Sequence, residues 1–351
     1  MEVNDVYRYS ALKGDDTIRL IYLQPCDDLE AAIECSLKDA RLNNYRDDIG
    51  DHYIAISYVW GDVNDTRSIL VDEKRLTITA SLELALRHVR DTQRVLRVWA
   101  DGVCIDQKDV HDRNRQVRLM GDVYSIALHT IIFLGLSSPQ CDAVMRMISL
   151  GVPYEKESTN NSGRSPSGLT ASQFATVVED EIFSRPWFTR VWILQELVLS
   201  QNPWLQCGQY RIRWHVFCKY VLSSQPSLWK LKSRAILMDM NESRNKFRTV
   251  SVESSQKPEE FMGSSLLKLL QTRRGCDLTD PRDMVYAHLG LVDHEARGKF
   301  PIDYDKTVAQ VYESIACFYI EFAGLETAFS LVDYIQPEDR PGFLPSWVTD
   351  W

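Results

Sequence analysis

The chain has 351 residues, 44% of them hydrophobic and 25% charged, which is an ordinary globular composition and excludes global disorder. This length suits one large domain or two smaller ones. The N-terminus carries acids early and has no apolar core, and no apolar run approaches the roughly 18–20 residues that a membrane helix needs. We therefore expect neither a secretory signal nor a membrane span.

The formal net charge is -9, which argues against nucleic acid as the main partner, because phosphate binding needs a basic face. A local basic patch around Arg113, Arg115 and Arg118 is one interpretation of the arginine-rich stretch there. The other interpretation, a solvated helix face, is the more common outcome of such spacing.

None of the eight cysteines forms a Cys-x-x-Cys pair, and their spacings match no zinc pattern. Several stand among apolar residues, where free thiols behave as small hydrophobes. We therefore expect a cytoplasmic, reducing environment, no structural disulfides and no metal site.

Residues 1–50 are expected to form an entry segment that packs on the core. Within it, Ile18–Leu23 is predicted to be a strand and Leu29–Ala40 a short helix or a loop.

Residues 51–214 alternate between strand and helix patterns, which predicts an α/β fold with an open parallel sheet flanked by helices. The predicted strands are Tyr53–Val59, a hairpin of Ser68–Val71 and Leu76–Thr79, Val95–Trp99, Thr130–Leu134, and a strand or hairpin at Trp204–Arg213. The predicted helices are Leu82–Val89 with Ser81 as its cap, Arg113–Ala127, Gln140–Leu150 and Ser184–Ser200, and Asp101–Asp109 is predicted to be a polar loop.

A stretch rich in Ser, Gly, Asn and Pro at 151–172 is expected to be a flexible surface insertion in this domain. Residues 215–351 are expected to form a mostly helical C-terminal extension, with a polar break near 250–260 and an extended aromatic tail at Leu344–Trp351. Because the chain stops on a tryptophan without a polar tail, we expect it to be part of a longer protein.

Common catalytic motifs for nucleotide, metal or serine-hydrolase chemistry do not occur in this sequence. In an open parallel sheet, ligands bind at the carboxyl ends of the strands. The two loops that follow the predicted strands there carry polar and aromatic residues: Tyr58, Trp60, Gly61 and Asp62 in the first, and Asp101, Gly102, Cys104, Asp106 and Gln107 in the second. The alternative is ordinary turn chemistry, in which Asp and Gly serve only to form turns.

The predicted helix after Pro186 adds a carboxylate to these loops. Trp192 and Glu196 are four residues apart, so they share one helix face. A carboxylate near a tryptophan in a partly desolvated site is expected to have a raised pKa. Spacing alone favours the alternative, a solvent-facing glutamate near the middle of the helix.

Three segments together resemble the heterokaryon incompatibility (HET) domain of filamentous fungi: YIAISYVWGD at 53–62, VWADGVCIDQKDVHDRNRQVRLMGDVYSIA at 98–127 and RPWFTRVWILQEL at 185–197. Two more, DPRDMVYAHLGL at 280–291 and LPSWVTDW at 344–351, resemble segments that commonly follow it. The resemblance implies a cytoplasmic role in self/non-self discrimination, with programmed cell death after fusion of incompatible cells.

HET domains are in turn similar to TIR domains, which implies a TIR-like sheet. The Ser57-Tyr58 strand end, with Asp62 after it, resembles the corresponding TIR strand, and Trp192 with Glu196-Leu197 resembles the TIR pattern Trp-x-x-x-Glu-Leu. In TIR enzymes that glutamate is the catalytic residue of NAD+ cleavage.

The resemblance therefore implies Glu196 as a catalytic carboxylate, with NAD+ as substrate and no permanently bound cofactor or metal. Nicotinamide in NAD+ is already a cationic leaving group, so the site must mainly stabilise an oxocarbenium-like ribose. The residues expected to bind the substrate or shape its pocket are Tyr58, Trp60, Gly61, Asp62, Asp101, Cys104, Asp106, Gln116 and Trp192.

Two alternatives stay open at this point. The chain is also interpretable as a non-catalytic module that triggers death by self-association or by binding an incompatibility partner protein. A third interpretation is a sensor that binds NAD+ or a related nucleotide without hydrolysis.

Overall fold

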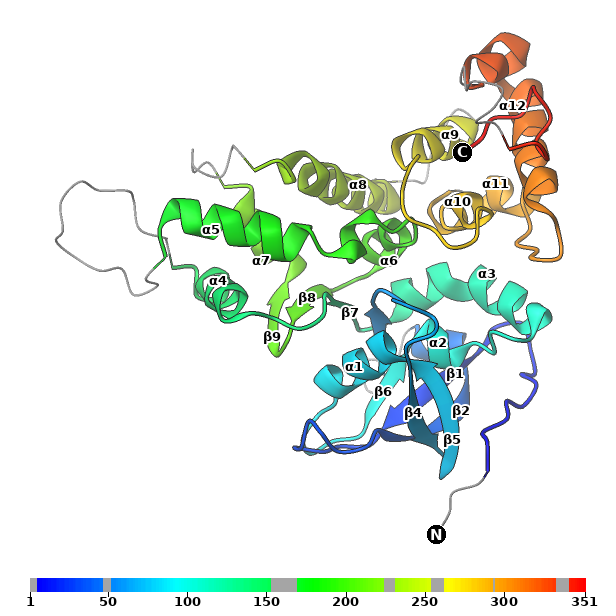
Figure 1. Cartoon of the computed structure of the whole chain (residues 1–351). Helices are drawn as coiled ribbons and strands as arrows, with labels where there is room; N and C mark the ends of the chain where they lie inside the picture. Colours follow the sequence, from blue (N-terminus) through cyan, green and yellow to red (C-terminus); the bar gives the residue numbers. More distant parts are fainter. Residues whose placement is uncertain are drawn as a thin grey trace, which may run out of the picture.

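One nine-stranded sheet runs through the first part of the computed structural model (Figure 1). The structure describes residues 5–46, 52–152, 169–223, 231–253, 262–292, 294–332 and 341–351. The strands follow the order β5-β4-β2-β1-β6-β3-β7-β8-β9 across the sheet. They are β1 (Thr17–Leu23), β2 (Glu34–Arg41), β3 (Ile54–Ser57), β4 (Thr66–Val71), β5 (Lys74–Thr79), β6 (Leu96–Trp99), β7 (His129–Phe133), β8 (Pro203–Cys207) and β9 (Tyr210–Arg213).

The sheet is mixed, with a parallel centre of β6, β3, β7 and β8. Strand β1 is antiparallel to both of its neighbours, β2 and β6, and β8 is antiparallel to β9. The predicted open α/β sheet flanked by helices is therefore confirmed, and its parallel character is confined to these central strands and the β2–β4 pair.

Strand β2 is the clearest error of the sequence prediction, which assigned residues 29–40 to a helix or a loop. Its residues are mostly polar and half-exposed or exposed, so they carry no strong alternating pattern. They form a strand because the edge of the buried β1 opposite β6 has backbone groups that need hydrogen-bonding partners. In the resulting register, Thr17 lies opposite Arg41 and Leu23 opposite Cys35.

The helices lie around this sheet and in a C-terminal group. Those of the first part are η1 (Leu42–Tyr45), α1 (Ala80–Val89), α2 (Asp101–Cys104), α3 (Val110–Ile126), α4 (Pro139–Leu150), α5 (Ala171–Val177), η2 (Val178–Phe183), η3 (Pro186–Thr189), α6 (Ile193–Leu199) and α7 (Trp214–Val221). Those of the second are α8 (Arg234–Glu253), α9 (Met262–Thr272), α10 (Asp283–Tyr286), η5 (Leu289–Leu291), α11 (His294–Lys299) and α12 (Val308–Ser330). The expected helical C-terminal extension is therefore confirmed.

Two predicted local features need correction. Helix α1 is capped by Thr79, whose hydroxyl accepts from the Leu82 amide at 3.3 Å, whereas the Ser81 hydroxyl donates to the Val59 carbonyl. The loop predicted at 101–109 begins with a helical turn, α2, because Val103 and Cys104 are fully buried there. The predicted insertion at 151–172 and the polar break near 250–260 fall largely outside the described residues.

The single helix predicted for Ser184–Ser200 is also wrong, because the backbone is extended at Arg190, between η3 and α6. At this break the Asp277 amide donates to the Thr189 carbonyl at 2.7 Å, and the Val191 amide donates to the Asp277 carbonyl at 3.1 Å. A segment nearly 90 positions later in the chain thus takes backbone groups that a continuous helix would have used itself.

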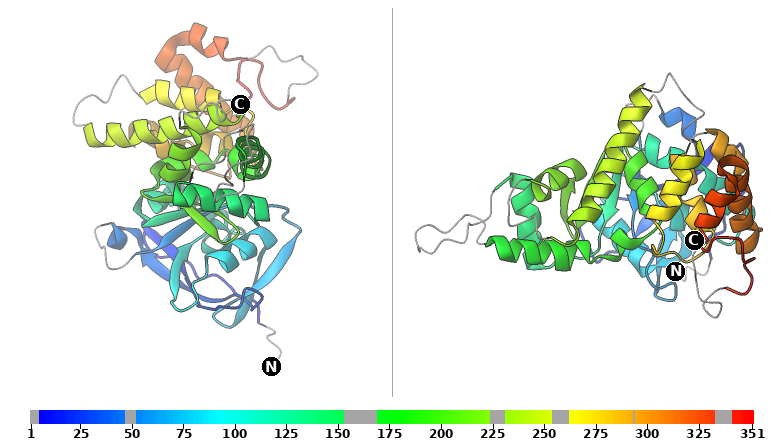
Figure 2. Two further views of the ribbon diagram at one scale, coloured as in Figure 1. Left: turned by 90° about the vertical axis from the view of Figure 1, so that its left-hand side faces the viewer. Right: turned by 90° about the horizontal axis from the view of Figure 1, so that it is seen from above.

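Helices α9 to α12 gather on the side of the molecule away from α4 and α5, above α3, whereas α8 lies against α6 and α7 (Figures 1 and 2). Buried residues of β1, β3 and β6 and of the segment after Leu266 belong to one continuous apolar cluster. A second cluster lies between β8, α4, α5 and α7. Among the described helices, none has the length and apolar character that crossing a bilayer requires, and all eight cysteines are free thiols.

Candidate functional site

A cleft of about 400 Å³ lies between the carboxyl ends of β3 and β6 and the C-terminal segment. Its wall is formed by the loops after β3 and β6, by α3, by the η3–α6 junction and by residues 277–304. Among its lining side chains are Trp60, Asp101, Arg113, Arg190, Trp192, Asp280, Asp283 and Tyr304.

The two loops predicted to carry the site are bonded to each other at the edge of this cleft. The Trp60 indole Nε1 donates to Asp101 Oδ2 at 2.8 Å, and the Gly102 amide donates to Asp101 Oδ1 at 2.7 Å. The Gln107 amide nitrogen donates to the Asp101 carbonyl at 3.0 Å. Asp101 therefore positions the Trp60 ring in the cleft wall, with Gly61 beside it in the left-handed backbone region at φ 72°.

Glu196 lies one layer beneath this wall and is 2% exposed. Its Oε2 accepts a hydrogen bond from the Ser57 hydroxyl at the end of β3, and Ser57 Oγ accepts one from Trp187 Nε1 at 2.7 Å. Burial raises the pKa of Glu196 to about 7, although the Arg190 charge and the Ser57 hydrogen bond act in the opposite direction. The alternative of a solvent-facing glutamate is therefore wrong.

Arg190 connects the buried layer with the cleft. Its side chain lines the cleft and donates to the Tyr58 carbonyl, and its own carbonyl accepts from Arg273 at 2.8 Å. Its charge is also the largest influence that lowers the pKa of Glu196. Glu196 itself is not among the lining residues, whereas Arg190 and Asp101, whose charges shift its pKa, both line the cleft.

Tyr58 is buried in the same layer at 3% exposure. The pKa of Tyr58 is raised well above its usual value, mainly by burial and to a smaller extent by the neighbouring Asp101 carboxylate. A Cβ atom on residue 102 would lie 2.6 Å from the Tyr58 hydroxyl and 2.8 Å from Leu82 Cδ2, so any larger residue at Gly102 would force these packed side chains to shift.

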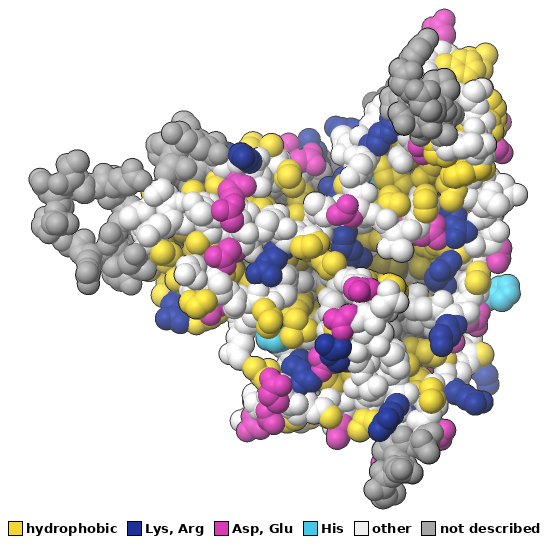
Figure 3. Space-filling model, viewed as in Figure 1, with side chains coloured by type: hydrophobic (Ala, Val, Ile, Leu, Met, Phe, Trp, Pro, Cys, Tyr) yellow, Lys and Arg dark blue, Asp and Glu magenta, His cyan; other side chains and the backbone are white. Residues whose placement is uncertain are grey.

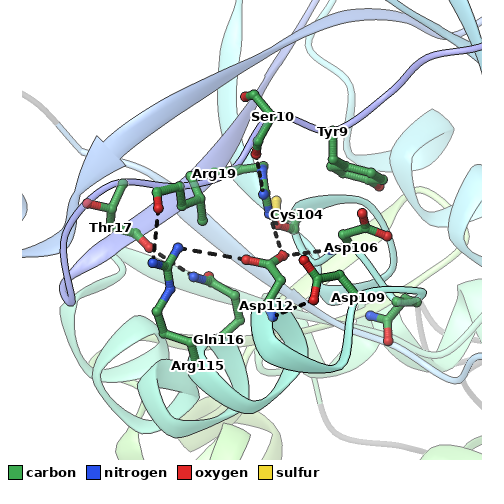
Figure 4. Close-up of polar contacts among 12 residues, drawn as sticks. Tyr9, Ser10, Thr17, Arg19, Cys104, Asp106, Asp109, Asp112, Arg115 and Gln116 are labelled. Atoms are coloured by element: carbon green, nitrogen blue, oxygen red, sulfur yellow. Dashed lines mark hydrogen bonds and ion pairs between the residues drawn. The ribbon is translucent and has the colours of Figure 1, made fainter.

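Three other predicted site residues lie in a polar network at the start of α3 (Figure 4). Arg19 of β1 pairs with Asp112 at 2.7 Å and donates to the Cys104 carbonyl at 3.1 Å. The Asp106 amide donates to Asp112 Oδ2 at 2.9 Å, and the Gln116 side chain donates to the Thr17 carbonyl at 2.9 Å. This network joins the N-terminal strand to α3.

Cys104, Asp106 and Gln116 are not among the residues that line the cleft. Asp62 is not among them either. It lies in an exposed turn, where its carboxylate accepts from the Asn64 amide at 2.9 Å. The predicted role of these four residues in ligand binding stays a prediction.

The sequence prediction missed the far wall of the cleft, which comes from residues 277–304. Asp283 there accepts from the Tyr304 hydroxyl at 2.6 Å. Burial raises the pKa of Asp283 to about 6, while the Tyr304 hydroxyl and the nearby Trp192 side chain lower it. The available signal was the DPRDMVYAHLGL segment, whose Asp280 and Asp283 are three residues apart on the sequence.

The cleft lining combines two arginines with aromatic rings and with four aspartates, Asp101, Asp277, Asp280 and Asp283. Arg113 and Arg190 offer two guanidinium groups, and Trp60, Trp192 and Tyr304 offer ring surfaces around the same space. Within the described ranges, His, Cys, Asp and Glu side chains do not come together in groups of three that could hold a metal ion. On the face shown in Figure 3, basic side chains are interspersed with acidic ones.

Comparison with known proteins bears on this site directly. Residues 53–196 match the model of the family described as heterokaryon incompatibility protein (HET). The chain is 28% identical over 425 aligned positions to heterokaryon incompatibility protein 6, OR allele, of Neurospora crassa. That alignment covers 98% of this chain and 59% of the relative, so the chain spans about three-fifths of the relative's length. No solved structure matches the chain.

Proposed function

Because residues 53–196 match the model of the heterokaryon incompatibility family, we propose that this chain is a cell-death effector in fungal self/non-self recognition that cleaves NAD+ to nicotinamide and ADP-ribose products. Glu196 is the catalytic carboxylate in this proposal. The observation that carries it is a buried carboxyl with a pKa of about 7, within the electrostatic influence of an arginine that lines the cleft.

The cleft has the size and chemistry that such a substrate needs. Its volume of about 400 Å³ falls in the range of small-molecule and cofactor sites. The substrate's pyrophosphate would pair with Arg190 and Arg113, and its bases would stack on Trp60 or Trp192.

Glu196 would stabilise the positive charge that develops on the ribose when the bond to nicotinamide breaks. Nicotinamide leaves as a neutral molecule, and water then takes its place on the ribose. To contact the ribose, Glu196 must be uncovered by movement of Arg190, which now donates to the Tyr58 carbonyl. The substrate's pyrophosphate is the group that would draw this guanidinium toward the cleft.

The pH profile follows from the charge that this role requires. Glu196 must be ionised to stabilise a cation, and its pKa is raised to about 7 by burial. Turnover should therefore rise as pH increases through about 7.

The test is nicotinamide release by the purified chain at high concentration, compared with Glu196→Gln. We expect the substitution to lower turnover by about 100-fold or more, because it removes the negative charge. The matched control is Glu242→Gln, an exposed glutamate on α8, and circular dichroism should show that both variants fold. Equal turnover of wild type and Glu196→Gln would refute the catalytic role.

One observation favours a second candidate function, a non-catalytic assembly module. Glu196 is 2% exposed and held by Ser57, as an ordinary structural residue would be. In that case the chain with Glu196→Gln would still cause cell death. Cell death would depend instead on self-association or on an incompatibility partner protein. Calorimetry with NAD+ separates this module from a nucleotide sensor, because only the sensor releases heat on binding.

A further inference from the structure

The wall of the cleft formed by residues 277–304 lies outside the residues that match the family model. We propose that Asp283 in this wall is a ligand-positioning residue, which accepts hydrogen bonds from ribose hydroxyl groups while Arg113 beside it takes a phosphate. The binding site for a ribosyl phosphate is then completed by the C-terminal segment. The identity of the ligand as a nucleotide rests on the proposed function.

The wall is attached to both sides of the cleft, so it is a fixed part of the site. On one side, Asp277 pairs with the backbone of residues 189–191, and its carboxylate accepts from the Thr189 hydroxyl. On the other side, the Tyr304 amide donates to Asn114 Oδ1 of α3 at 2.8 Å. Arg282 connects these parts by donating to the Tyr304 carbonyl at 2.6 Å.

The two carboxylates of this wall differ in what already neutralises them. Asp280 forms a two-point ion pair with Arg282, at 2.8 Å and 2.7 Å. Asp283 has no ion pair with any residue that the structure describes, and the Tyr304 hydroxyl that donates to it is uncharged. A carboxylate has about four acceptor positions, so Asp283 keeps capacity to accept further hydrogen bonds from a ligand.

Arg113 supplies the complementary charge next to this carboxylate. Its guanidinium lies 3.8 Å from the centroid of the Tyr304 ring, which fixes its plane. Its Nε is buried and donates to no acceptor in the described part of the chain. An acceptor of hydroxyl protons therefore stands at the hydroxyl of Tyr304 and a donor to phosphate over its ring, as a ribosyl phosphate requires.

The test measures binding of ADP-ribose and of inorganic pyrophosphate to the full chain by calorimetry, for wild type and Asp283→Asn. ADP-ribose contains both ribose hydroxyls and phosphates, whereas pyrophosphate lacks hydroxyls. We expect Asp283→Asn to weaken ADP-ribose binding about 10-fold or more, because a charged acceptor is lost. Pyrophosphate binding should stay unchanged or tighten, because a negative charge has been removed from the cleft.

Two further variants complete the design. Arg113→Gln should weaken both probes, because it removes the phosphate donor. Asp305→Asn, an exposed aspartate in the same segment, should change neither.

The inference is overturned if Asp283→Asn leaves ADP-ribose binding unchanged, or if it weakens both probes equally, as general damage to the wall would. Absence of ADP-ribose binding by the wild type would also overturn it. The two proposals can fail separately. If ADP-ribose binding depends on Asp283 but no nicotinamide is released, or its release does not depend on Glu196, the inference about Asp283 holds and the proposed NAD+ cleavage fails.

Discussion

A carboxyl group whose ionisation is opposed by its surroundings makes the stability of this protein depend on pH. Burial raises the pKa of Glu196 from 4.5 to about 7. A carboxyl whose pKa is raised in the folded state contributes to the free energy of unfolding. This contribution is complete below about pH 4.5 and is lost as pH rises through about 7. The folded protein therefore has to keep an increasingly charged group in an apolar layer above neutral pH.

We predict that Glu196→Gln unfolds at higher urea concentration than wild type at pH 8 and at a similar concentration at pH 5. A shift of the pKa from 4.5 to about 7 corresponds to about 3 kcal/mol of unfolding free energy, which sets the upper limit of the gain. Urea unfolding of both proteins at the two pH values measures it. If the difference between them is the same at pH 5 and pH 8, the raised pKa is not the cause.

A stability gain from a substitution that abolishes activity is the usual signature of a functional group held in an unfavourable environment. The same pair of variants therefore links the structural and the catalytic question. Loss of turnover together with a gain at pH 8 would support the catalytic role, whereas a structural Glu196 would leave turnover intact.

At the scale of secondary structure, helix α6 is short and its position is set by neighbouring elements. Its seven residues carry Glu196 near the start, and isolated helices of this length are unstable in water. At its carboxyl end the buried Arg244 of α8 donates to the carbonyls of Leu197 at 2.6 Å and Ser200 at 2.5 Å. Arg244 thus satisfies carbonyls that the end of a helix leaves without partners.

We predict that Arg244→Met lowers the free energy of unfolding by about 2–3 kcal/mol, because buried carbonyls lose charge-assisted hydrogen bonds. The rate of amide hydrogen exchange should increase more in α6 than in the other helices and strands. Arg248→Met is the matched control, an exposed arginine on α8 that donates to the Gln201 carbonyl at 2.9 Å. Equal effects of the two substitutions would show that Arg244 does not hold the helix end.

At the scale of the whole molecule, the family-matching residues 53–196 do not contain the complete sheet. Strand β1 lies between β2 and β6, with Ile21 opposite Val98. Its buried Arg19 also pairs with Asp112 of α3 (Figure 4). Removing the first strands exposes an edge of β6 and leaves the buried Asp112 with only the more distant Arg115, at 3.8 Å, as a cation, which is costly.

We predict that a chain of residues 52–351 loses cooperative unfolding, whereas one of residues 5–351 keeps it. The truncated chain lacks β1 and β2 but retains every residue of the family match and of the cleft wall. Thermal unfolding followed by circular dichroism, together with limited proteolysis, compares the two. A sharp transition for residues 52–351 would show that the N-terminal strands are dispensable.

The amino-acid sequence by itself determined the elements with strong local patterns and the two loops that meet at the cleft. Strands β3, β6 and β7 and helices α1, α3 and α4 follow from their apolar periodicity, because each buries a continuous stripe or face. Trp60 and Asp101 come together at the cleft because parallel strands bring their carboxyl ends to the same edge of the sheet, while their role in ligand binding stays a prediction.

Only the tertiary structure decided the rest, because the controlling contacts join residues far apart in the chain. The polar β2 is a strand because β1 needs a partner, and the predicted helix around Arg190 is broken because Asp277 pairs with its backbone. The same kind of contact brings Asp283 and Tyr304 into the cleft. The burial that raises the pKa of Glu196 also comes from packing around α6, which no local spacing encodes.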